Sequence, residues 1–151
     1  KNTIVIMTSN IGSHDLIENM QEDGQISDEV SERVTGQLKN YFRPEFLNRI
    51  DDIILFSPLT KTQIIDIIVL SLAGLEKRLA QRDMKLKLSD EAKGFIADEA
   101  YDAHYGARPV KRYLQKHIET EIASMIIRGN VVDGQTIIID VKDGSLTFSA
   151  E

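Results

Sequence analysis

The chain has 151 residues, 42% hydrophobic and 28% charged, an ordinary composition for a globular protein of one or two small domains. Its net charge of −6 argues against binding to duplex nucleic acid, and no apolar run approaches the ~20 residues that cross a bilayer. It contains no cysteine, and the three histidines have no ligand spacing, so we expect no metal site formed by these residues and a cytoplasmic location.

Two short apolar runs in the first third of the chain predict strands. They are Thr3–Met7 (TIVIM) and Asp52–Phe56 (DIILF), and both are typical of strands buried on both faces of a parallel sheet. Two strands leave most of such a sheet absent, so we expect residues 1–57 to be a fragment of a larger α/β domain.

A helix is predicted between these strands, from Ser27 to Tyr41, because Val30, Val34 and Leu38 recur every four residues. The preceding polar residues 21–25 (QEDGQ) indicate a loop. Pro58 interrupts the chain, and we place a domain boundary near residue 57.

The next segment predicts a helix, a strand and a second helix. Thr60 and Gln63 form a T-x-x-Q capping box at the start of a helix that runs to about Arg82. Residues 85–88 (KLKL) alternate as a strand does, and Ser89 then caps a helix that ends near residue 100.

The last segment predicts one long helix followed by a β-hairpin. The helix begins at Arg108 and Pro109, runs to about residue 128 and stops at Gly129. The strands are 136–142 and 145–150, joined by an Asp-Gly pair at residues 143–144, which is a strong signal for a type I′ turn. Residues 58–151 therefore predict a compact α+β domain with the order helix, strand, helix, helix, hairpin.

No complete catalytic motif for nucleotide hydrolysis is present. The phosphate-binding pattern G-x-x-x-x-G-K-[ST] does not occur. Residues 137–140 (IIID) superficially resemble the apolar strand that ends in Asp-Glu, but Val141 follows Asp140 and the hairpin context differs. We therefore expect this chain alone to hydrolyse no ATP.

Three motifs nevertheless resemble one family. Residues 4–10 (IVIMTSN) resemble the sensor-1 strand of the Clp family of ring-forming AAA+ proteins, residues 42–51 (FRPEFLNRID) its arginine-finger segment, and residues 105–112 (YGARPVKR) its sensor-2 motif. The motifs stand in the family's order, and the resemblance covers essentially the whole chain. It implies an α/β part of an AAA+ large subdomain (1–57), followed by an α+β AAA+ small, or lid, subdomain with a C-terminal β-hairpin (58–151).

The resemblance also implies roles for individual residues. Asn10 would be sensor 1, Arg49 the finger that reaches the neighbouring subunit's nucleotide, and Arg108 the sensor 2 that contacts the γ-phosphate of ATP on its own subunit. Arg43 is a second candidate for nucleotide contact. Without the motifs, Asn10 is an ordinary turn residue and Arg108 a solvated one.

Arg49 has a structural alternative as well. It could form a salt bridge with a nearby carboxylate from Glu45, Asp51 or Asp52, which would contribute ~0–1 kcal/mol if exposed. For Ile64 and Ile68, packing in the core is the favoured interpretation over contact with adenine.

Within the Clp family the chain most resembles the second ATPase module of a ClpB-type disaggregase. The interval Ile11–Tyr41 contains no apolar docking tripeptide of the kind that binds a ClpP-type protease. The resemblance implies a homo-hexameric parent that uses ATP, with Mg²⁺ held by residues outside this chain. Unfolded or aggregated polypeptides would be its substrates, and a DnaK-type chaperone its partner.

Two other interpretations stay open. One is a Clp unfoldase that feeds a ClpP-type protease, and the other is a protein-interaction domain with no link to nucleotide. Binding of a peptidase ring would favour the first of these. An Arg108→Ala variant with an unchanged nucleotide response would favour the second.

Overall fold

The structure is a computed structural model that describes residues 2–19, 24–102 and 105–151. The chain divides into two compact units, Lys1–Pro58 and Leu59–Glu151, close to the boundary expected at residue 57. Each unit is described separately. Of the predicted loop at residues 21–25, residues 21–23 lie outside the described part of the chain.

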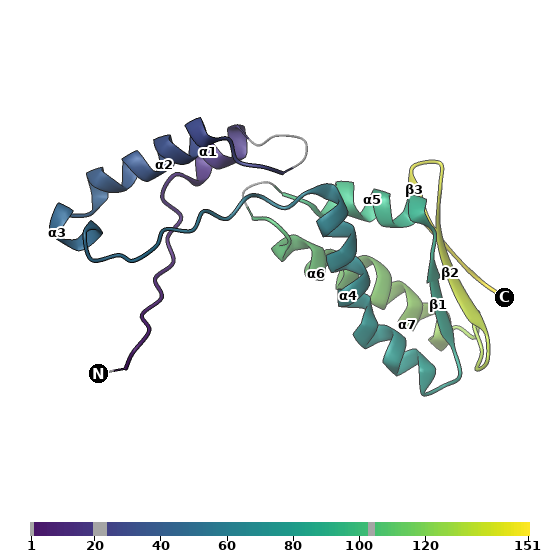
Figure 1. Ribbon diagram of the computed structural model, residues 1–151. Helices are drawn as coiled ribbons and strands as arrows, with labels where there is room; N and C mark the ends of the chain where they lie inside the picture. The colour runs from purple at the N-terminus through teal and green to yellow at the C-terminus, as the bar shows by residue number, and fades with distance from the viewer. Residues whose placement is uncertain (1, 20–23, 103–104) are drawn as a thin grey trace. The chain divides into compact units, whose positions relative to one another are not determined.

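The first unit contains three helices, α1 (Ser13–Glu18), α2 (Asp28–Tyr41) and α3 (Pro44–Leu47) (Figure 1). The predicted helix is confirmed as α2, and the Ser27 hydroxyl caps it by accepting the Val30 N–H at 3.3 Å. The short helices α1 and α3 were not predicted, because each has too few residues for an apolar period to be visible.

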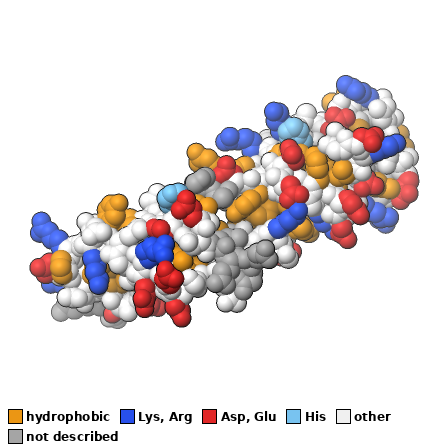
Figure 2. All heavy atoms as spheres, turned by 90° about the horizontal axis from the view of Figure 1, so that it is seen from above, with side chains coloured by type: hydrophobic (Ala, Val, Ile, Leu, Met, Phe, Trp, Pro, Cys, Tyr) orange, Lys and Arg blue, Asp and Glu red, His pale blue; other side chains and the backbone are white. Residues whose placement is uncertain are grey.

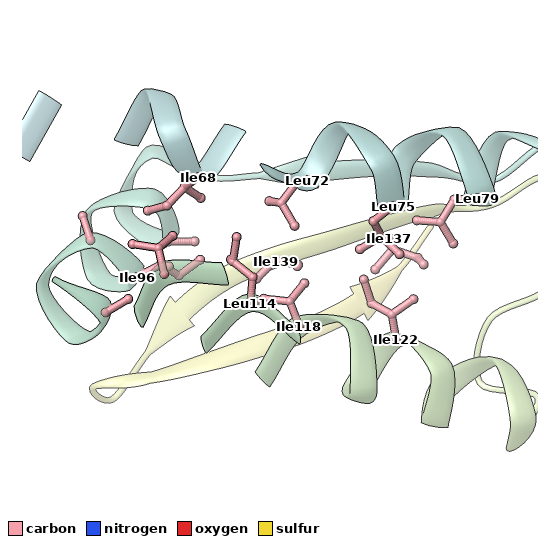
Figure 3. Close-up of a cluster of buried hydrophobic side chains, with 14 of the residues drawn as sticks. Ile68, Leu72, Leu75, Leu79, Ile96, Leu114, Ile118, Ile122, Ile137 and Ile139 are labelled. Carbon is pink, nitrogen blue, oxygen red and sulfur yellow. The ribbon is translucent and has the colours of Figure 1, made fainter. Parts of the chain in front are cut away.

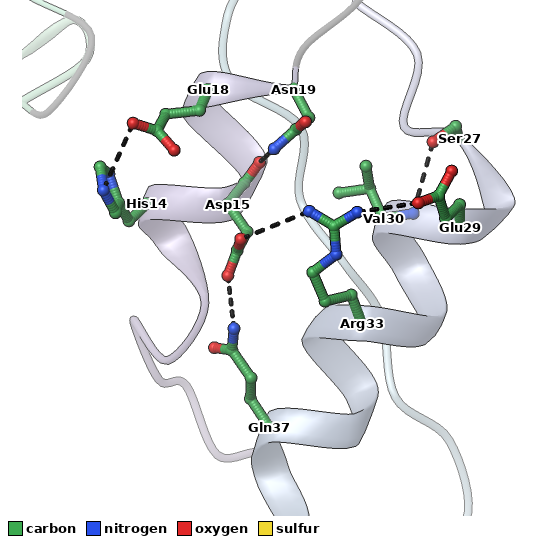
Figure 4. Close-up of polar contacts among 9 residues, drawn as sticks. All are labelled: His14, Asp15, Glu18, Asn19, Ser27, Glu29, Val30, Arg33 and Gln37. Carbon is green, nitrogen blue, oxygen red and sulfur yellow. Dashed lines mark hydrogen bonds and ion pairs between the residues drawn. The ribbon is translucent and has the colours of Figure 1, made fainter.

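Helices α1 and α2 are held together by packing and by polar contacts. Gly12 has φ +76°, and a Cβ at this position would lie 2.7 Å from Cγ1 of the buried Val34. The Asp15 carboxylate accepts a hydrogen bond from Gln37 and lies 3.8 Å from the Arg33 guanidinium, as Figure 4 shows. These contacts hold the turn that follows residue 10 against helix α2.

The two predicted strands of the first unit are wrong. Thr3–Met7 and Asp52–Phe56 carry no strand hydrogen bonds, and all their apolar side chains except the half-buried Leu55 are exposed, with Ile4 at 89% and Phe56 at 83%. A strand exists only when a neighbour pairs with its backbone, and no described segment of this chain pairs with either run. Both runs are rich in residues that favour strands, but composition alone does not provide a neighbouring strand.

The second unit is an α+β domain in which helices cover one face of a three-stranded sheet (Figure 1). The predicted order of elements is confirmed. The elements are α4 (Lys61–Ala80), β1 (Lys85–Leu88), α5 (Asp90–Ala100), α6 (Arg108–Leu114), η1 (Gln115–Glu119), α7 (Thr120–Ile127), β2 (Thr136–Lys142) and β3 (Ser145–Ala150).

The helix ends in this unit follow the predicted signals. The capping box is complete: the Gln63 N–H donates to Thr60 Oγ1 at 3.3 Å, and the Thr60 N–H donates to Gln63 Oε1 at 2.9 Å. Gly129, with φ +73°, ends α7: its N–H donates to the Ile126 carbonyl at 3.2 Å, and that of Asn130 to Met125 at 2.9 Å. This pair of bonds is a Schellman motif.

The long C-terminal helix is interrupted by one π turn, η1, which the sequence analysis did not predict. Here the Thr120 N–H donates to the carbonyl of Gln115, five residues back, and the Thr120 hydroxyl donates to the same oxygen at 3.0 Å. The helix therefore continues from Arg108 to Ile127 with one turn that is wider than the rest.

The sheet has the order β1-β2-β3, with β1 and β2 parallel and β2 and β3 antiparallel. Between β2 and β3, Asp143 and Gly144 have φ +51° and +72°, and Lys142 pairs with Ser145. Positive φ at both central residues confirms the predicted type I′ turn.

A single core joins the helices to the inner face of the sheet (Figure 3). Ile64 and Ile68 of α4 are 1% and 0% exposed, so both belong to the core, as expected. Around them pack Leu72, Leu75, Leu79, Ile96, Leu114, Ile118, Ile122, Ile137 and Ile139. On the face that Figure 2 draws, acidic and basic side chains are interspersed with hydrophobic ones. No helix among the described residues is long and apolar enough to cross a membrane.

Candidate functional site

Asn10 lies in an exposed turn immediately before α1. Its backbone carbonyl accepts the Ser13 N–H at 3.2 Å, and the neighbouring Ser9 hydroxyl accepts the Ile11 N–H at 3.1 Å. The side-chain amide of Asn10 has no hydrogen-bond partner among the described residues. The turn is therefore ordered by its backbone, which leaves the amide of Asn10 available to a ligand.

Arg43 and Arg49 stand at the two ends of the short helix α3. Arg43 is its N-cap, and Pro44 occupies the first helical position, where a fixed φ suits the helix. The rings of Phe42 and Phe46 pack with their centroids 5.2 Å apart, and the Arg49 N–H donates to the Phe46 carbonyl at 3.0 Å. This short, locally bonded turn presents both guanidinium groups on one segment.

The guanidinium groups of Arg43 and Arg49 are exposed and form no ion pair with any described residue. The salt bridges considered for Arg49 with Glu45, Asp51 or Asp52 are therefore not formed. Three other arginines are paired within 4.0 Å: Arg33 with Glu29 and Asp15, Arg78 with Glu119, and Arg82 with Asp133. Arg43 and Arg49 are thus among the exposed cations that no described carboxylate occupies.

Arg108 opens helix α6 in the second unit and is exposed without an ion pair among the described residues. Just before it, the Gly106 N–H donates to the Asp102 carbonyl at 2.6 Å, and Gly106 has φ +61°. Val110, fully buried two residues later, anchors the same helical turn in the core. The Arg108 side chain therefore projects from a fixed support, as do the exposed Lys111 and Arg112 on the following turn.

Asp140, the only acid in the strand-like motif at residues 137–140, has a structural role. It accepts hydrogen bonds from the Ser89 hydroxyl at 2.7 Å and from the Val141 N–H at 2.8 Å, and these bonds hold its pKa below the usual range. Its carboxylate thus links β2 to the cap of α5. Within the described ranges, no group of three or more His, Asp or Glu residues could hold a metal ion.

The structure brings only some of the predicted residues together. Arg43 and Arg49 share one segment, Asn10 lies in the same unit, and Arg108 belongs to the other unit. Free guanidinium groups fit the oxygens of a phosphate, and a free amide fits a water molecule or a phosphate oxygen. The Phe42–Phe46 pair within residues 42–51 was missed, although its i, i+4 spacing was visible in the sequence.

Two family models match the chain. Residues 59–139 match the C-terminal, D2-small domain of ClpB protein, and residues 1–53 match an AAA domain of the Cdc48 subfamily. The two matches divide the chain near the boundary between its two units.

Individual relatives give the same result. The chain is 47% identical to Chaperone protein ClpB of Bacillus anthracis over 97% of its length and 50% identical to that of Clostridium perfringens over 99%. It spans 17% of the length of each of these relatives. A solved structure of the Saccharomyces cerevisiae Hsp104:casein complex superposes with a TM-score of 0.73 at 33% identity, covering 97% of this chain and 26% of that one.

Proposed function

This chain belongs to the ClpB family of AAA+ proteins, and we propose that it forms the nucleotide-sensing and ring-contact part of an ATP-driven protein disaggregase. One observation carries the proposal beyond the family: the arginines of the finger and sensor-2 motifs are exposed and form no ion pair with any described residue. Arg33, Arg78 and Arg82 are held in ion pairs, and Arg128, which is also free of them within the described chain, lies outside the motifs. An arginine kept free of local carboxylates is suited to binding phosphate.

Arg49 is proposed to act on the nucleotide of the neighbouring subunit. Its planar guanidinium would place a permanent positive charge against phosphate oxygens, and the α3 turn would fix the direction in which it points. An arginine supplied from a neighbour in this way contributes roughly 10³–10⁵ in rate in related phosphoryl-transfer enzymes. Arg43, on the same segment, is proposed as a second contact.

Asn10 and Arg108 are proposed to act on the nucleotide of their own subunit. The free amide of Asn10 can orient a water molecule or bond to a phosphate oxygen. The guanidinium of Arg108, at the start of α6, would bind a terminal phosphate and so make the position of the lid unit depend on which nucleotide is present. ATP supplies the phosphoryl group, and Mg²⁺ would be held by residues outside this chain.

The assembly and partners follow from the same proposal. Arg49 can act between subunits only in an oligomer, and from the resemblance to the ring-forming Clp proteins we propose a homo-hexamer. We propose the cytoplasm as its location. Its substrates would be unfolded or aggregated polypeptides, in keeping with the casein present in the Hsp104 structure, and a DnaK-type chaperone would be its partner.

The proposal is tested in a full-length ClpB-family protein that carries this chain. ATP turnover and reactivation of an aggregated reporter enzyme are measured for the wild type, Arg49→Ala, Arg49→Lys and Arg128→Ala. Arg128 is the matched control, because it is exposed and unpaired but lies outside all three motifs. We expect Arg49→Ala to abolish both activities, Arg49→Lys to restore little because lysine lacks the planar fork, and Arg128→Ala to behave as wild type.

Two results would count against the proposal. If Arg49→Ala retained the turnover of Arg128→Ala, another residue would be the finger. If the wild type hydrolysed ATP but reactivated nothing even with its DnaK-type partner, a Clp unfoldase that feeds a ClpP-type protease would be the better interpretation, and binding of a peptidase ring would then be measured.

A further inference from the structure

The second unit has a hollow of about 420 Å³ on its surface, and none of the residues that line it belongs to the three motifs. Ring-bearing side chains from four elements line it: Phe95 of α5, Tyr113 of α6, His117 of η1 and Phe148 of β3. The Tyr113 and His117 rings are stacked, with centroids 4.4 Å apart and planes 30° apart. The hollow is therefore walled largely by the faces and edges of π systems.

One carboxylate lines the hollow. It belongs to Glu121, and among the described residues that form the lining there is no lysine or arginine. Burial raises the pKa of the Tyr113 hydroxyl, and the charge of the nearby Glu99 raises it further. Glu121 thus places a carboxylate in the lining, and Glu99 acts on the Tyr113 hydroxyl at its edge.

The wall of the hollow also contains the one π turn among the described residues. His117 lies within η1, and Tyr113 lies in the turn just before it. Single π turns inside α-helices occur frequently at functional sites. This backbone feature therefore places the stacked Tyr113 and His117 rings at a site of a kind that is often functional.

We propose that this hollow binds the cationic side chain of an arginine or lysine presented by another polypeptide. Aromatic faces attract such cations, arginine most of all, because its planar group stacks on a ring while its edge reaches a carboxylate. A second hollow, between α4 and α7, offers no such complementarity, because its arginines Arg78 and Arg82 are already paired with Glu119 and Asp133. The inference does not depend on the proposed nucleotide roles.

The experiment uses the whole 151-residue chain, labelled with ¹⁵N and ¹³C, at low salt and pH 8. Two blocked pentapeptides of glycine and serine are titrated to ~10 mM, one with a central arginine and the other with citrulline, which has nearly the same shape but no charge. We expect the arginine peptide to shift the resonances of Phe95, Tyr113, His117 and Phe148 in a saturable way, and citrulline to cause little change.

Variants separate the rings from the charge. Tyr113→Leu should weaken binding about two- to fivefold through the lost cation–π contact, and Tyr41→Leu, at an exposed tyrosine of the other unit, should not. Glu121→Gln should weaken binding and Glu76→Gln on α4 should not; thermal melting checks that each variant is folded. Equal shifts with citrulline, shifts confined to other residues, or no shifts at all would each overturn the proposal.

Discussion

The Ser89 hydroxyl connects two parts of the second unit, and its removal gives a sharp test of the structure. It accepts the Ala92 N–H at 3.0 Å, which caps α5, and it donates to Oδ1 of Asp140 on β2 at 2.7 Å. Loss of an N-cap costs about 1 kcal/mol. In a domain of this size that loss corresponds to a fall in Tm of roughly 4–8 °C, and the broken bond to Asp140 lowers the Tm further.

The assay is thermal unfolding of the 151-residue chain, followed by circular dichroism at pH 7. Ser89→Ala should show the fall in Tm, and Ser89→Thr, which keeps the hydroxyl, should recover most of it. Ser149→Ala, at an exposed serine on β3, is the matched control and should melt as the wild type does. If Ser89→Ala melted within 1 °C of the wild type, the hydroxyl would not link α5 to β2 as described.

The same bond predicts a pH dependence. Hydrogen bonds from Ser89 and Val141 lower the pKa of Asp140 in the folded state below the ordinary value of about 3.9. A lowered folded-state pKa adds stability that is fully present above the unfolded value and is lost as the pH falls through the folded one. The difference in Tm between wild type and Ser89→Ala should therefore shrink below about pH 4; a constant difference down to pH 2 would contradict it.

Two further predictions concern the hairpin and the missing phosphate loop. Gly144→Val should lower the Tm of the second unit, because a β-branched residue is strained at φ +72°; an unchanged melting curve would refute the type I′ turn. The isolated chain should show no ATP turnover in a coupled assay, because it lacks the G-x-x-x-x-G-K-[ST] loop. Turnover that survived repeated purification would refute that reasoning.

The second unit could be predicted from sequence because its signals are local. The Thr60–Gln63 capping box, the Ser89 cap and the Asp143–Gly144 turn each act within four residues, and each is present in the structure. These cap and turn signals agree with the apolar periodicity of the helices, and together they define the order of the elements. The strand predictions for residues 3–7 and 52–56 were wrong for the opposite reason. Strand formation depends on a partner distant in sequence, which composition does not reveal.

The candidate site was predictable only in part. Motifs located Asn10, Arg49 and Arg108, but the sequence could not show that these side chains are free of local partners. The three carboxylates near Arg49 suggested a salt bridge, and whether one forms depends on side-chain directions around a four-residue helix. The hollow around Tyr113 was also not predictable, because Phe95 and Phe148, which both line it, are more than fifty residues apart in the sequence.

The π turn has a consequence for the orientation of Arg108. Val110, Leu114, Ile118 and Ile122 are all buried and are spaced by exact fours, and in an ideal α-helix each such step overshoots a full turn by about 40°. In helix α4 the three-residue step from Leu72 to Leu75 brings the buried positions back to one face. In the helix from Arg108 to Ile127 the wider turn η1 has this effect instead.

Without the wider turn, a helix that packed against the core through Ile122 would have a different orientation at its start. Its first turn would be rotated about the helix axis by as much as about 120°. Arg108 would then leave the helix in another direction, although no residue near it had changed. The angular setting of a proposed phosphate contact thus depends on hydrogen bonds made at Gln115 and Thr120, two turns further along the helix.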